Sequence, residues 1–198
     1  MGLTRQAKTL TSAQLDALLV HVAEGRNPRR DRVIVLLSFL AGLRAKEVSG
    51  VRWRMVTDVA GVVATALRLE DRASKGRSGR VIPLHALLRA AIEDLHEAEW
   101  TGPEDFVLRF RKGSRDAIIR SAAVQGLFRT WYDALGFRGA SSHSGRRTFI
   151  TQAAAHLAQI RGGSLRDVQV LAGHASLELT QRYIDRDDDV HRQLVDLA

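Results

Sequence analysis

The stretch between Val51 and Leu84 differs in pattern from the rest of the chain, and it constrains the fold more than any other feature. β-Branched residues and turn formers recur here, in the segments MVTDVAG, VVATALRLE and GRVIPL. Such segments are typical of short strands, and Asp58–Gly61 and Ser74–Gly79 supply turns between them. We therefore expect a small antiparallel sheet of two or three strands in this stretch.

Helical patterns occupy most of the remaining chain. Thr11 and Gln14 have the spacing of a capping box, which predicts a helix through about Glu24. A largely buried helix is expected next, up to Ala41, where Gly42 can end it. The expected helices cover about 11–24, 29–41, 44–49, 85–99, 121–135, 143–160, 164–171, 177–184 and 188–197. The sequence thus predicts a mainly α chain with a small antiparallel β-sheet, an α+β fold.

Composition limits the classes of protein to which the chain can belong. It has 198 residues, 45% of them apolar, which is enough for one domain with a core. It has no cysteine, which excludes disulfides and cysteine-based zinc sites. No apolar run reaches membrane-spanning length, and the first ten residues lack the apolar core of a signal peptide. We expect a cytoplasmic, nucleoid-associated protein without a membrane contact.

The charge of the chain favours a polyanionic partner. Lys and Arg outnumber Asp and Glu by 30 to 22, which gives a net charge of +8. Arginine predominates over lysine, and its planar guanidinium can donate two hydrogen bonds to one phosphate. Nucleic acid is the commonest partner of such a chain, although charge alone fits a merely soluble basic protein equally well.

Six residues suited to phosphate chemistry follow one another in a fixed order. They are Arg44, Lys75, His143, Arg146, His174 and Tyr183. Arg44 begins a helical turn, and Glu47, three residues on, could hold it in place. His143 and Arg146 share one helix face, and Tyr183 follows His174 by nine residues. A phenol can attack a phosphodiester when cations and a base lie beside it, so the set predicts transesterification without metal, ATP or other cofactor.

Each of these residues alone has a more ordinary explanation. Arg44 could be a solvated surface arginine, Lys75 a polar loop residue and Tyr183 a packing residue. The histidines could be capping or core residues. It is the complete set, in order and in these local contexts, that makes the ordinary explanation improbable.

The chain resembles the catalytic domain of the tyrosine recombinase (phage integrase) family. The likeness rests on AGLRAKE, SKGRSGR, HSGRR, AGH and TQRYID, and it spans about Leu10 to Asp185. It implies that Arg44, Arg146 and His174 stabilise the pentacoordinate phosphate, and that Glu47 supports Arg44. It further implies Lys75 as general acid, His143 as an aid to proton transfer, and Tyr183 as nucleophile. The fold implied is the tyrosine recombinase catalytic-domain fold.

The resemblance also sets the expected domain organisation and partners. We expect an N-terminal tail over residues 1–9, the catalytic domain over 10–185, and a C-terminal tail or helix over 186–198 that docks on a neighbouring protomer. Double-stranded DNA is the implied partner, bound by a homotetramer. Full integrases carry a further DNA-binding domain ahead of the catalytic one, whereas about ten residues stand there in this chain. It therefore resembles the short single-domain members, and a separate protein could supply the missing DNA grip.

One position departs from the family pattern. Gly145 stands before Arg146, where the family usually has a leucine. Glycine in a helix costs about 1 kcal/mol relative to alanine and removes a core side chain. We expect a repacked core at this position and an intact site.

Further basic residues could line the DNA backbone, although solvated faces explain them as well. The residues expected to contact DNA are Arg77, Arg80, Arg109, Arg111, Lys112, Arg115 and Arg147.

Two other functions remain open on the sequence. One is an accessory or regulatory DNA-binding protein that keeps the recombinase fold without recombining DNA alone. The other is a topoisomerase-like enzyme that nicks and seals one duplex. Integration, excision, inversion and resolution share one chemistry, so the sequence does not separate them.

Overall fold

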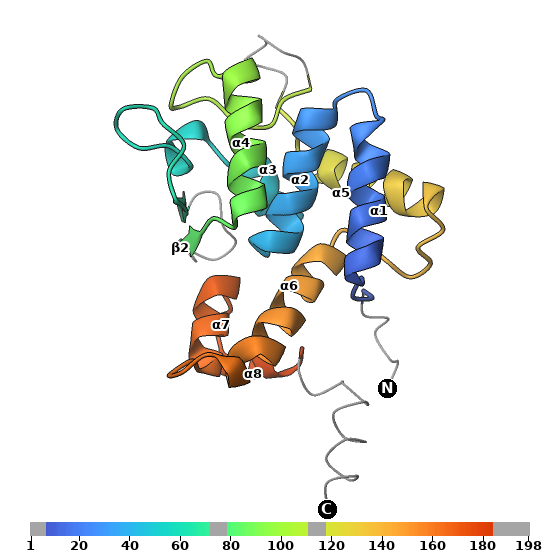
Figure 1. Cartoon of the computed structure of the whole chain (residues 1–198), viewed down its shortest axis with the longest axis vertical. Coiled ribbons are helices and arrows are strands. Elements are labelled where there is room, and N and C mark those ends of the chain that lie inside the picture. The colour runs from blue at the N-terminus through green and yellow to red at the C-terminus, as the bar shows by residue number, and fades with distance from the viewer. Residues whose placement is uncertain (1–6, 72–78, 111–117, 184–198) are drawn as a thin grey trace, which may run out of the picture.

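The fold is mainly helical with one small sheet, as the computed structural model shows over residues 7–71, 79–110 and 118–183 (Figure 1). Short 3₁₀ turns lie at Trp53–Met55 and His156–Gln159. The helices are α1 (Ser12–Ala23), α2 (Pro28–Leu40), α3 (Ala45–Gly50), α4 (Ala86–Glu99), α5 (Ser121–Ala134), α6 (Ser144–Ala155), α7 (Leu165–Ala172) and α8 (Leu177–Gln181). The strands are β1 (Ala66–Leu69) and β2 (Arg80–Pro83). This confirms the predicted fold class.

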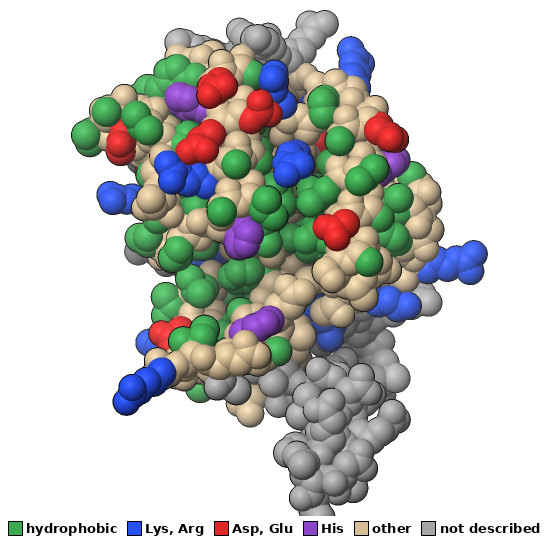
Figure 2. All heavy atoms as spheres, in the orientation of Figure 1, with side chains coloured by type: hydrophobic (Ala, Val, Ile, Leu, Met, Phe, Trp, Pro, Cys, Tyr) green, Lys and Arg blue, Asp and Glu red, His purple; other side chains and the backbone are tan. Residues whose placement is uncertain are grey.

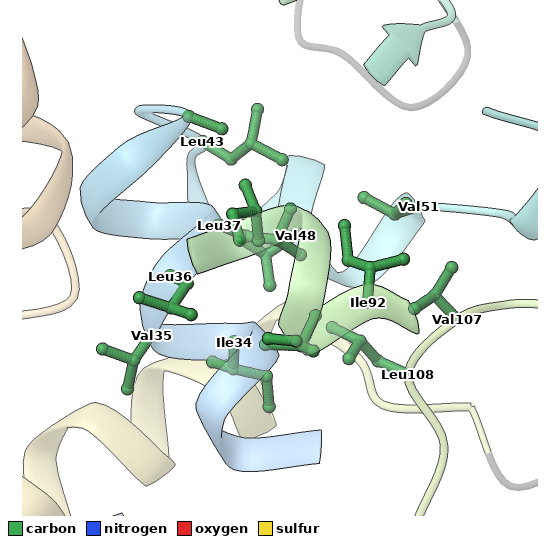
Figure 3. Packing of buried hydrophobic residues seen from close by; sticks show 14 of the residues in the cluster. Ile34, Val35, Leu36, Leu37, Leu43, Val48, Val51, Ile92, Val107 and Leu108 are labelled. Carbon is green, nitrogen blue, oxygen red and sulfur yellow. The ribbon is translucent and has the colours of Figure 1, made fainter. Parts of the chain in front are cut away.

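Helix α2 is the centre of the larger hydrophobic core. Its residues 33–37 are completely buried, because α2 packs against α1, α3, α4 and α6. Figure 3 shows Ile34 and Leu37 of α2 close to Val48 of α3 and Ile92 of α4. Gly42 follows α2 with φ +64°, a backbone conformation that glycine adopts without steric cost. The chain thereby turns sharply between α2 and α3, as the sequence predicts.

The sheet contains two strands. β1 and β2 run antiparallel, with Ala66 opposite Pro83 and Leu69 opposite Arg80. The stretch before β1, in which a third strand was allowed, forms a 3₁₀ turn and two isolated bridges, one between Arg52 and Phe106 and one between Thr57 and Val63. The predicted turn at Asp58 is confirmed, since its carboxylate accepts hydrogen bonds from the backbone N–H groups two and four residues on. Most of the second predicted turn lies outside the described residues.

A second, smaller hydrophobic cluster lies between α6 and α7. Its buried residues are Ile150, Val168 and Ala172, and Tyr183 packs on its edge. Helix α6 contacts α2 on one side and α7 on the other, so it joins the two clusters. It was expected to run to residue 160, but the α-helix ends at Ala155 and continues as a 3₁₀ turn.

Residues 7–10, the N-terminal strap, run alongside α6. The backbone N–H of Leu10 donates to Thr148 Oγ1 at 2.9 Å, and Arg147 Nη1 donates to the carbonyl of Ala7 at 3.1 Å. Thr148 is buried and donates in turn to Ser144 O within α6. The strap is therefore attached to the helix that begins at the predicted site residues His143 and Arg146.

Gly145 lies where α6 comes closest to α2. A Cβ at this position would lie 2.4 Å from Ser38 Oγ and 2.7 Å from a ring carbon of Phe39. Phe39 is only 2% exposed, so its ring fills the space beside Gly145. The bulk at this contact comes from α2 and not from α6.

We expect Gly145→Ala to destabilise the protein, because the new methyl group overlaps Phe39 and Ser38. Overpacking of this kind typically costs about 1–3 kcal/mol. Gly126 is the matched control, since it is also helical but a Cβ placed on it would meet no described atom within 4 Å. Gly126→Ala should stabilise by up to about 1 kcal/mol through helix propensity. Urea unfolding of both variants measures the difference, and equal effects would contradict the packing argument.

Candidate active site

Arg44 and Glu47 form the first part of the site at the start of α3. Arg44 is the N-cap residue, and its backbone N–H donates to Glu47 Oε2 at 2.8 Å. Its Nη1 donates to Glu47 Oε1 at 3.1 Å. The Glu47 side chain is fully buried, whereas the Arg44 side chain is 26% exposed. Arg44 is thus held by Glu47 at its backbone and at one guanidinium nitrogen, while its side chain stays partly exposed to a ligand.

Arg146 forms the second part and joins three segments. It is 2% exposed, and it donates from Nη1 to Gly42 O at 2.6 Å and from Nη2 to Ala172 O at 2.7 Å. Burial, and then the positive charge of Arg44, lower the pKa of Arg146 to about 10. It therefore keeps its charge at neutral pH and lies close enough to Arg44 for the two charges to interact.

His143 precedes α6 at its N-cap position. Partial burial of the ring, and then the charges of Arg146 and Arg44, lower the pKa of His143. The imidazole is therefore neutral at pH 7. A neutral imidazole can accept a proton, which is the property a base at this place requires.

His174 and Tyr183 complete the site. Gly173 ends α7 in the left-handed conformation, with φ +62°, and directs the chain so that His174 is 9% exposed. The rings of His174 and Tyr183 stack, with centroids 5.3 Å apart and planes 26° apart. The charge of Tyr183 also acts on the pKa of Arg146, after burial, Arg44 and Glu47. The phenol is thus close to the histidine and to the buried arginine.

Thr180 is a site residue that the sequence did not reveal. It is completely buried, and its Oγ1 lies 2.9 Å from His174 Nδ1. A threonine that donates here leaves the proton of the neutral imidazole on Nε2. The available signal was weak: a threonine near the end of the short helix that precedes Tyr183.

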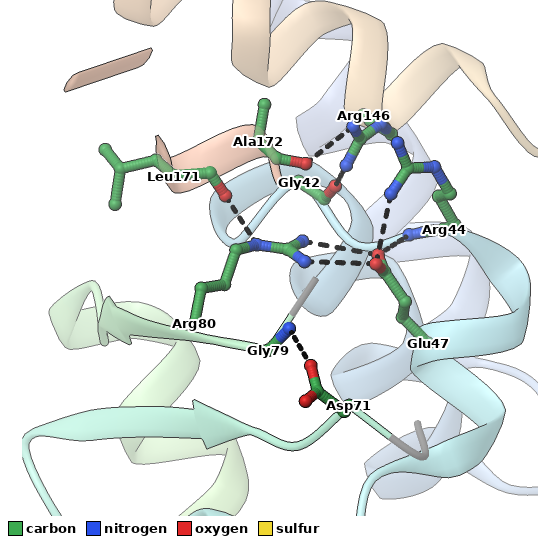
Figure 4. Close-up of polar contacts among 9 residues, drawn as sticks. All are labelled: Gly42, Arg44, Glu47, Asp71, Gly79, Arg80, Arg146, Leu171 and Ala172. Atoms are coloured by element: carbon green, nitrogen blue, oxygen red, sulfur yellow. Dashed lines mark hydrogen bonds and ion pairs between the residues drawn. The ribbon is translucent and has the colours of Figure 1, made fainter. Parts of the chain in front are cut away.

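Two of the predicted DNA contacts are corrected by the structure. Arg80 is buried in an ion pair with Glu47, at 3.0 Å, and belongs to the site interior (Figure 4). Arg109 is 3% exposed at its side chain, and it donates to Phe106 O and to Thr101 Oγ1. Neither guanidinium is presented to a DNA backbone, because each is enclosed by protein groups that accept its hydrogen bonds.

The remaining basic residues stay predictions. Arg147 is partly buried and holds the N-terminal strap through Ala7. The others lie outside the described residues, and they are Lys75, Arg77, Arg111, Lys112 and Arg115.

The face formed by α1, α2 and α4 carries charges of both signs. Figure 2 shows acidic and basic side chains intermixed over these helices. Arg29 of α2 pairs with Asp94 of α4 at 3.0 Å, which is one such contact. This face offers no continuous positive surface to a nucleic acid among the residues that the structure describes.

The protonation of His174 gives a prediction for stability against pH. Burial, then Arg146 and Arg44, lower the pKa of His174 to about 4, below its ordinary value of 6.5. Between these values the unfolded chain binds a proton that the folded chain excludes. The contribution of His174 to the free energy of unfolding is therefore complete above pH 6.5. It is lost as the pH drops toward 4, which lowers the free energy of unfolding by up to about 3 kcal/mol.

Chemical unfolding at pH 7, 5.5 and 4.5 measures this dependence. His174→Asn removes this titrating group and should reduce the slope of the profile, while His143, whose pKa is also lowered, keeps its share. The same profile is measured for His21→Asn, a substitution in the last turn of α1, as a comparison. A profile unchanged by His174→Asn would contradict the assignment.

The family of the chain follows from its whole sequence. The sequence model described as "Phage integrase family" matches residues 8–189, nearly the whole chain. The chain belongs to the phage integrase family. This confirms the resemblance predicted from the six residues and their contexts.

Curated relatives agree with this family. The tyrosine recombinase XerC of Pelobacter propionicus is 29% identical over 154 residues, which cover 78% of this chain and 47% of that protein. XerA of Thermococcus onnurineus is 28% identical over 176 residues, which cover 89% of this chain and 57% of XerA. XerC of Nitrobacter winogradskyi is 32% identical over 176 residues, covering 84% and 50%. The integrase-family chain thus spans about half the length of the curated relatives it matches.

Solved recombinase structures share the fold. XerA recombinase superposes with a TM-score of 0.71 at 18% identity, over 97% of this chain and 65% of that one. A lambda integrase dimer bound to a COC′ core site superposes with a TM-score of 0.66 at 21% identity, over 94% of this chain and 62% of the integrase chain. The predicted tyrosine recombinase catalytic-domain fold is confirmed. Within residues 7–71, 79–110 and 118–183, no helix has both the length and the apolar character needed to cross a bilayer.

Proposed function

We propose that this chain is a site-specific DNA recombinase that cleaves and rejoins strands through a 3′-phosphotyrosine at Tyr183. The observation that carries the proposal is the convergence of Arg44, Arg146, His174 and Tyr183 from three separate parts of the chain. The stacked rings of His174 and Tyr183 and the electrostatic coupling of Arg146 to Arg44 and Tyr183 support it. Family membership supports the same chemistry.

The proposed step is a transesterification in which one P–O bond replaces another. The Tyr183 oxygen attacks phosphorus, and its proton passes toward His143. The bond from phosphorus to the 5′-oxygen breaks, and Lys75 protonates the departing oxygen. Arg44, Arg146 and His174 donate hydrogen bonds to the non-bridging oxygens, where charge builds up in the transition state.

The balance of this step makes it reversible without an energy source. The phosphodiester energy is retained in the phosphotyrosine ester, so a 5′-hydroxyl from another strand can reverse the step and rejoin the DNA. Neither ATP nor a metal ion enters this balance. The residues Arg44 and Arg146 supply the positive charge that metal ions supply in other phosphoryl-transfer sites.

A nicked suicide duplex tests the function directly. The duplex carries the DNA that flanks the protein's own coding sequence, with a nick placed so that the short 5′-hydroxyl fragment diffuses away after cleavage. The expected product is an SDS-resistant adduct whose peptide map places the DNA on Tyr183. Tight binding without an adduct would favour the accessory protein. Relaxation of a supercoiled plasmid without strand exchange would favour the nicking and sealing enzyme.

Recombination between two duplexes would require four protomers, and we propose a homotetramer on DNA. The predicted docking segment is the tail after Tyr183, with Leu194 and Leu197 as anchors; it lies outside the described residues. Deleting residues 187–198 should abolish synapsis and recombination in a gel-shift and strand-exchange assay. Unchanged synapsis would contradict tail docking. A separate DNA-binding partner protein is the further expectation, to be tested by adding host extract to the same assay.

A further inference from the structure

Arg80 lies at the start of β2 and points toward the core of the site. Its side chain is 3% exposed. Nη1 and Nη2 donate to the two oxygens of Glu47, at 3.0 and 3.3 Å, and Nε donates to Leu171 O at 2.8 Å (Figure 4). One guanidinium therefore connects β2, α3 and the end of α7.

Glu47 is shared by two arginines. Arg44 donates to it from the backbone and from Nη1, while Arg80 donates from both terminal nitrogens. Burial by itself raises the pKa of Glu47, but the hydrogen bond and charge of Arg80, and then those of Arg44, outweigh burial and leave this pKa below its usual value. Glu47 is thus a carboxylate whose charge is divided between a buried and an accessible arginine.

The end of α7 is held by two arginines on consecutive carbonyls. Arg80 binds Leu171 O and Arg146 binds Ala172 O. Gly173 follows, and a Cβ on it would lie 2.6 Å from Arg80 Nη1, so the absence of a side chain lets the guanidinium approach. His174 is the next residue. Its position therefore depends on contacts made by Arg80 as well as by Arg146.

The three arginines and Glu47 together carry two net positive charges in the site interior. Without Arg80 they would carry one, and Glu47 would pair with Arg44 alone. In such a pair the carboxylate would compensate the charge of Arg44 more completely and leave its guanidinium less free to bind a phosphate. The contacts of Arg80 thus bear on both the electrostatics and the geometry of the site.

We propose that Arg80 is a positioning residue for strand cleavage, which shares Glu47 with Arg44 and holds the α7 end that precedes His174. This role rests on the proposed function. Arg80 does not touch the reacting phosphate in this arrangement; it acts through Arg44 and His174. Loss of Arg80 is expected to change the rate of the chemical step more than the affinity for DNA, because many other contacts contribute to that affinity.

The test compares Arg80→Met and Arg80→Lys with the wild type on the nicked duplex under single-turnover conditions. Rates are corrected for the folded fraction, measured by thermal unfolding. Arg80→Met should lower the rate about 100-fold, the scale expected when catalytic groups are misplaced by a distant change. Arg80→Lys keeps the charge but not the three contacts. Its rate should lie between those of the wild type and Arg80→Met. The Kd for uncut duplex should change by less than about threefold.

Two further variants separate positioning from general stability. Arg30→Met removes another buried arginine, which pairs with Asp31 at 2.7 Å at the far end of α2, and should lower stability without lowering the corrected rate. Glu47→Gln combined with Arg80→Met removes the unshared carboxylate, and should be faster than Arg80→Met alone. If Arg30→Met lowered the corrected cleavage rate as much as Arg80→Met, the role of Arg80 would be in stability alone.

The outcomes also distinguish this proposal from the function on which it rests. A wild type that forms no adduct on any flanking duplex would overturn the recombinase function and the Arg80 role with it. A wild type that forms the adduct, together with an Arg80→Met rate within about threefold of it, would overturn the Arg80 role alone.

Discussion

Replacing Tyr183 by phenylalanine is expected to abolish the covalent DNA adduct. The substitution removes one oxygen and keeps the ring that packs on the small cluster and stacks on His174. Fold and DNA binding should therefore persist while the attacking atom is gone. Removal of a catalytic nucleophile lowers rates on the order of 10⁴-fold or more, which places the adduct below detection in an SDS gel.

The chain supplies its own control for this experiment, since it has one other tyrosine, Tyr132. Tyr132 is 2% exposed in α5, and burial raises its pKa above the ordinary value, so it cannot serve as the nucleophile. Its hydroxyl makes no hydrogen bond within the described residues, so Tyr132→Phe should be close to neutral for stability. Adduct formation should be as in the wild type. An adduct that survives in Tyr183→Phe and disappears in Tyr132→Phe would refute the assignment.

Arg146→Lys is expected to lower the rate of adduct formation by about 10²–10³-fold, the range seen when one donor to a transition-state oxyanion is lost. A lysine keeps the charge, but its ammonium is a single point and cannot bind Gly42 O and Ala172 O and still reach a phosphate. The loss should appear in the single-turnover rate on the nicked duplex. Part of it should be structural, because the α7 end loses one of its two anchors.

Arg30→Lys is the matched control for this variant. Arg30 is also buried, at 6% exposure, and it lies in the first turn of α2, whereas Gly42 follows the last turn. Thirteen helical residues separate the two ends by roughly 20 Å. Arg30→Lys should therefore lower stability alone. If it slowed cleavage as much as Arg146→Lys, the effect of Arg146 would be one of folding and not of phosphate binding.

Local signals in the sequence were sufficient for most of the secondary structure. The capping box of Thr11 and Gln14 is present as predicted, and Gly42 ends α2 through its positive φ. These features depend on residues three or four apart, so a single sequence contains the necessary information. The sequence predicted two or three strands and did not choose between them. Whether the chain around Thr57 and Val63 forms a strand pair or an isolated bridge depends on how far the partners stay in register, which the local pattern does not contain.

The interior of the site was harder to predict, because its contacts join distant positions. Arg80 lies 33 residues from Glu47 and 91 from Leu171, so no local spacing connects them. One signal was available nonetheless. Arg80 and Ile82 point to the same face of β2, the buried one, while Val81 is exposed. An arginine on the core face of a strand indicates an internal ion pair more than a surface contact.

The N-terminal strap has a consequence for forces applied to the chain. Two of its hydrogen bonds are made with Arg147 and Thr148, the two residues after Arg146, and a third is accepted by Gly139 O. Tension on the backbone ahead of Ala7, from a fused protein or from a partner bound there, would thus load α6 through Arg147 as well as the large core through Leu10. A mechanical load at the front of the chain would in this way reach the helix that carries Arg146, the buried arginine that we propose binds the phosphate.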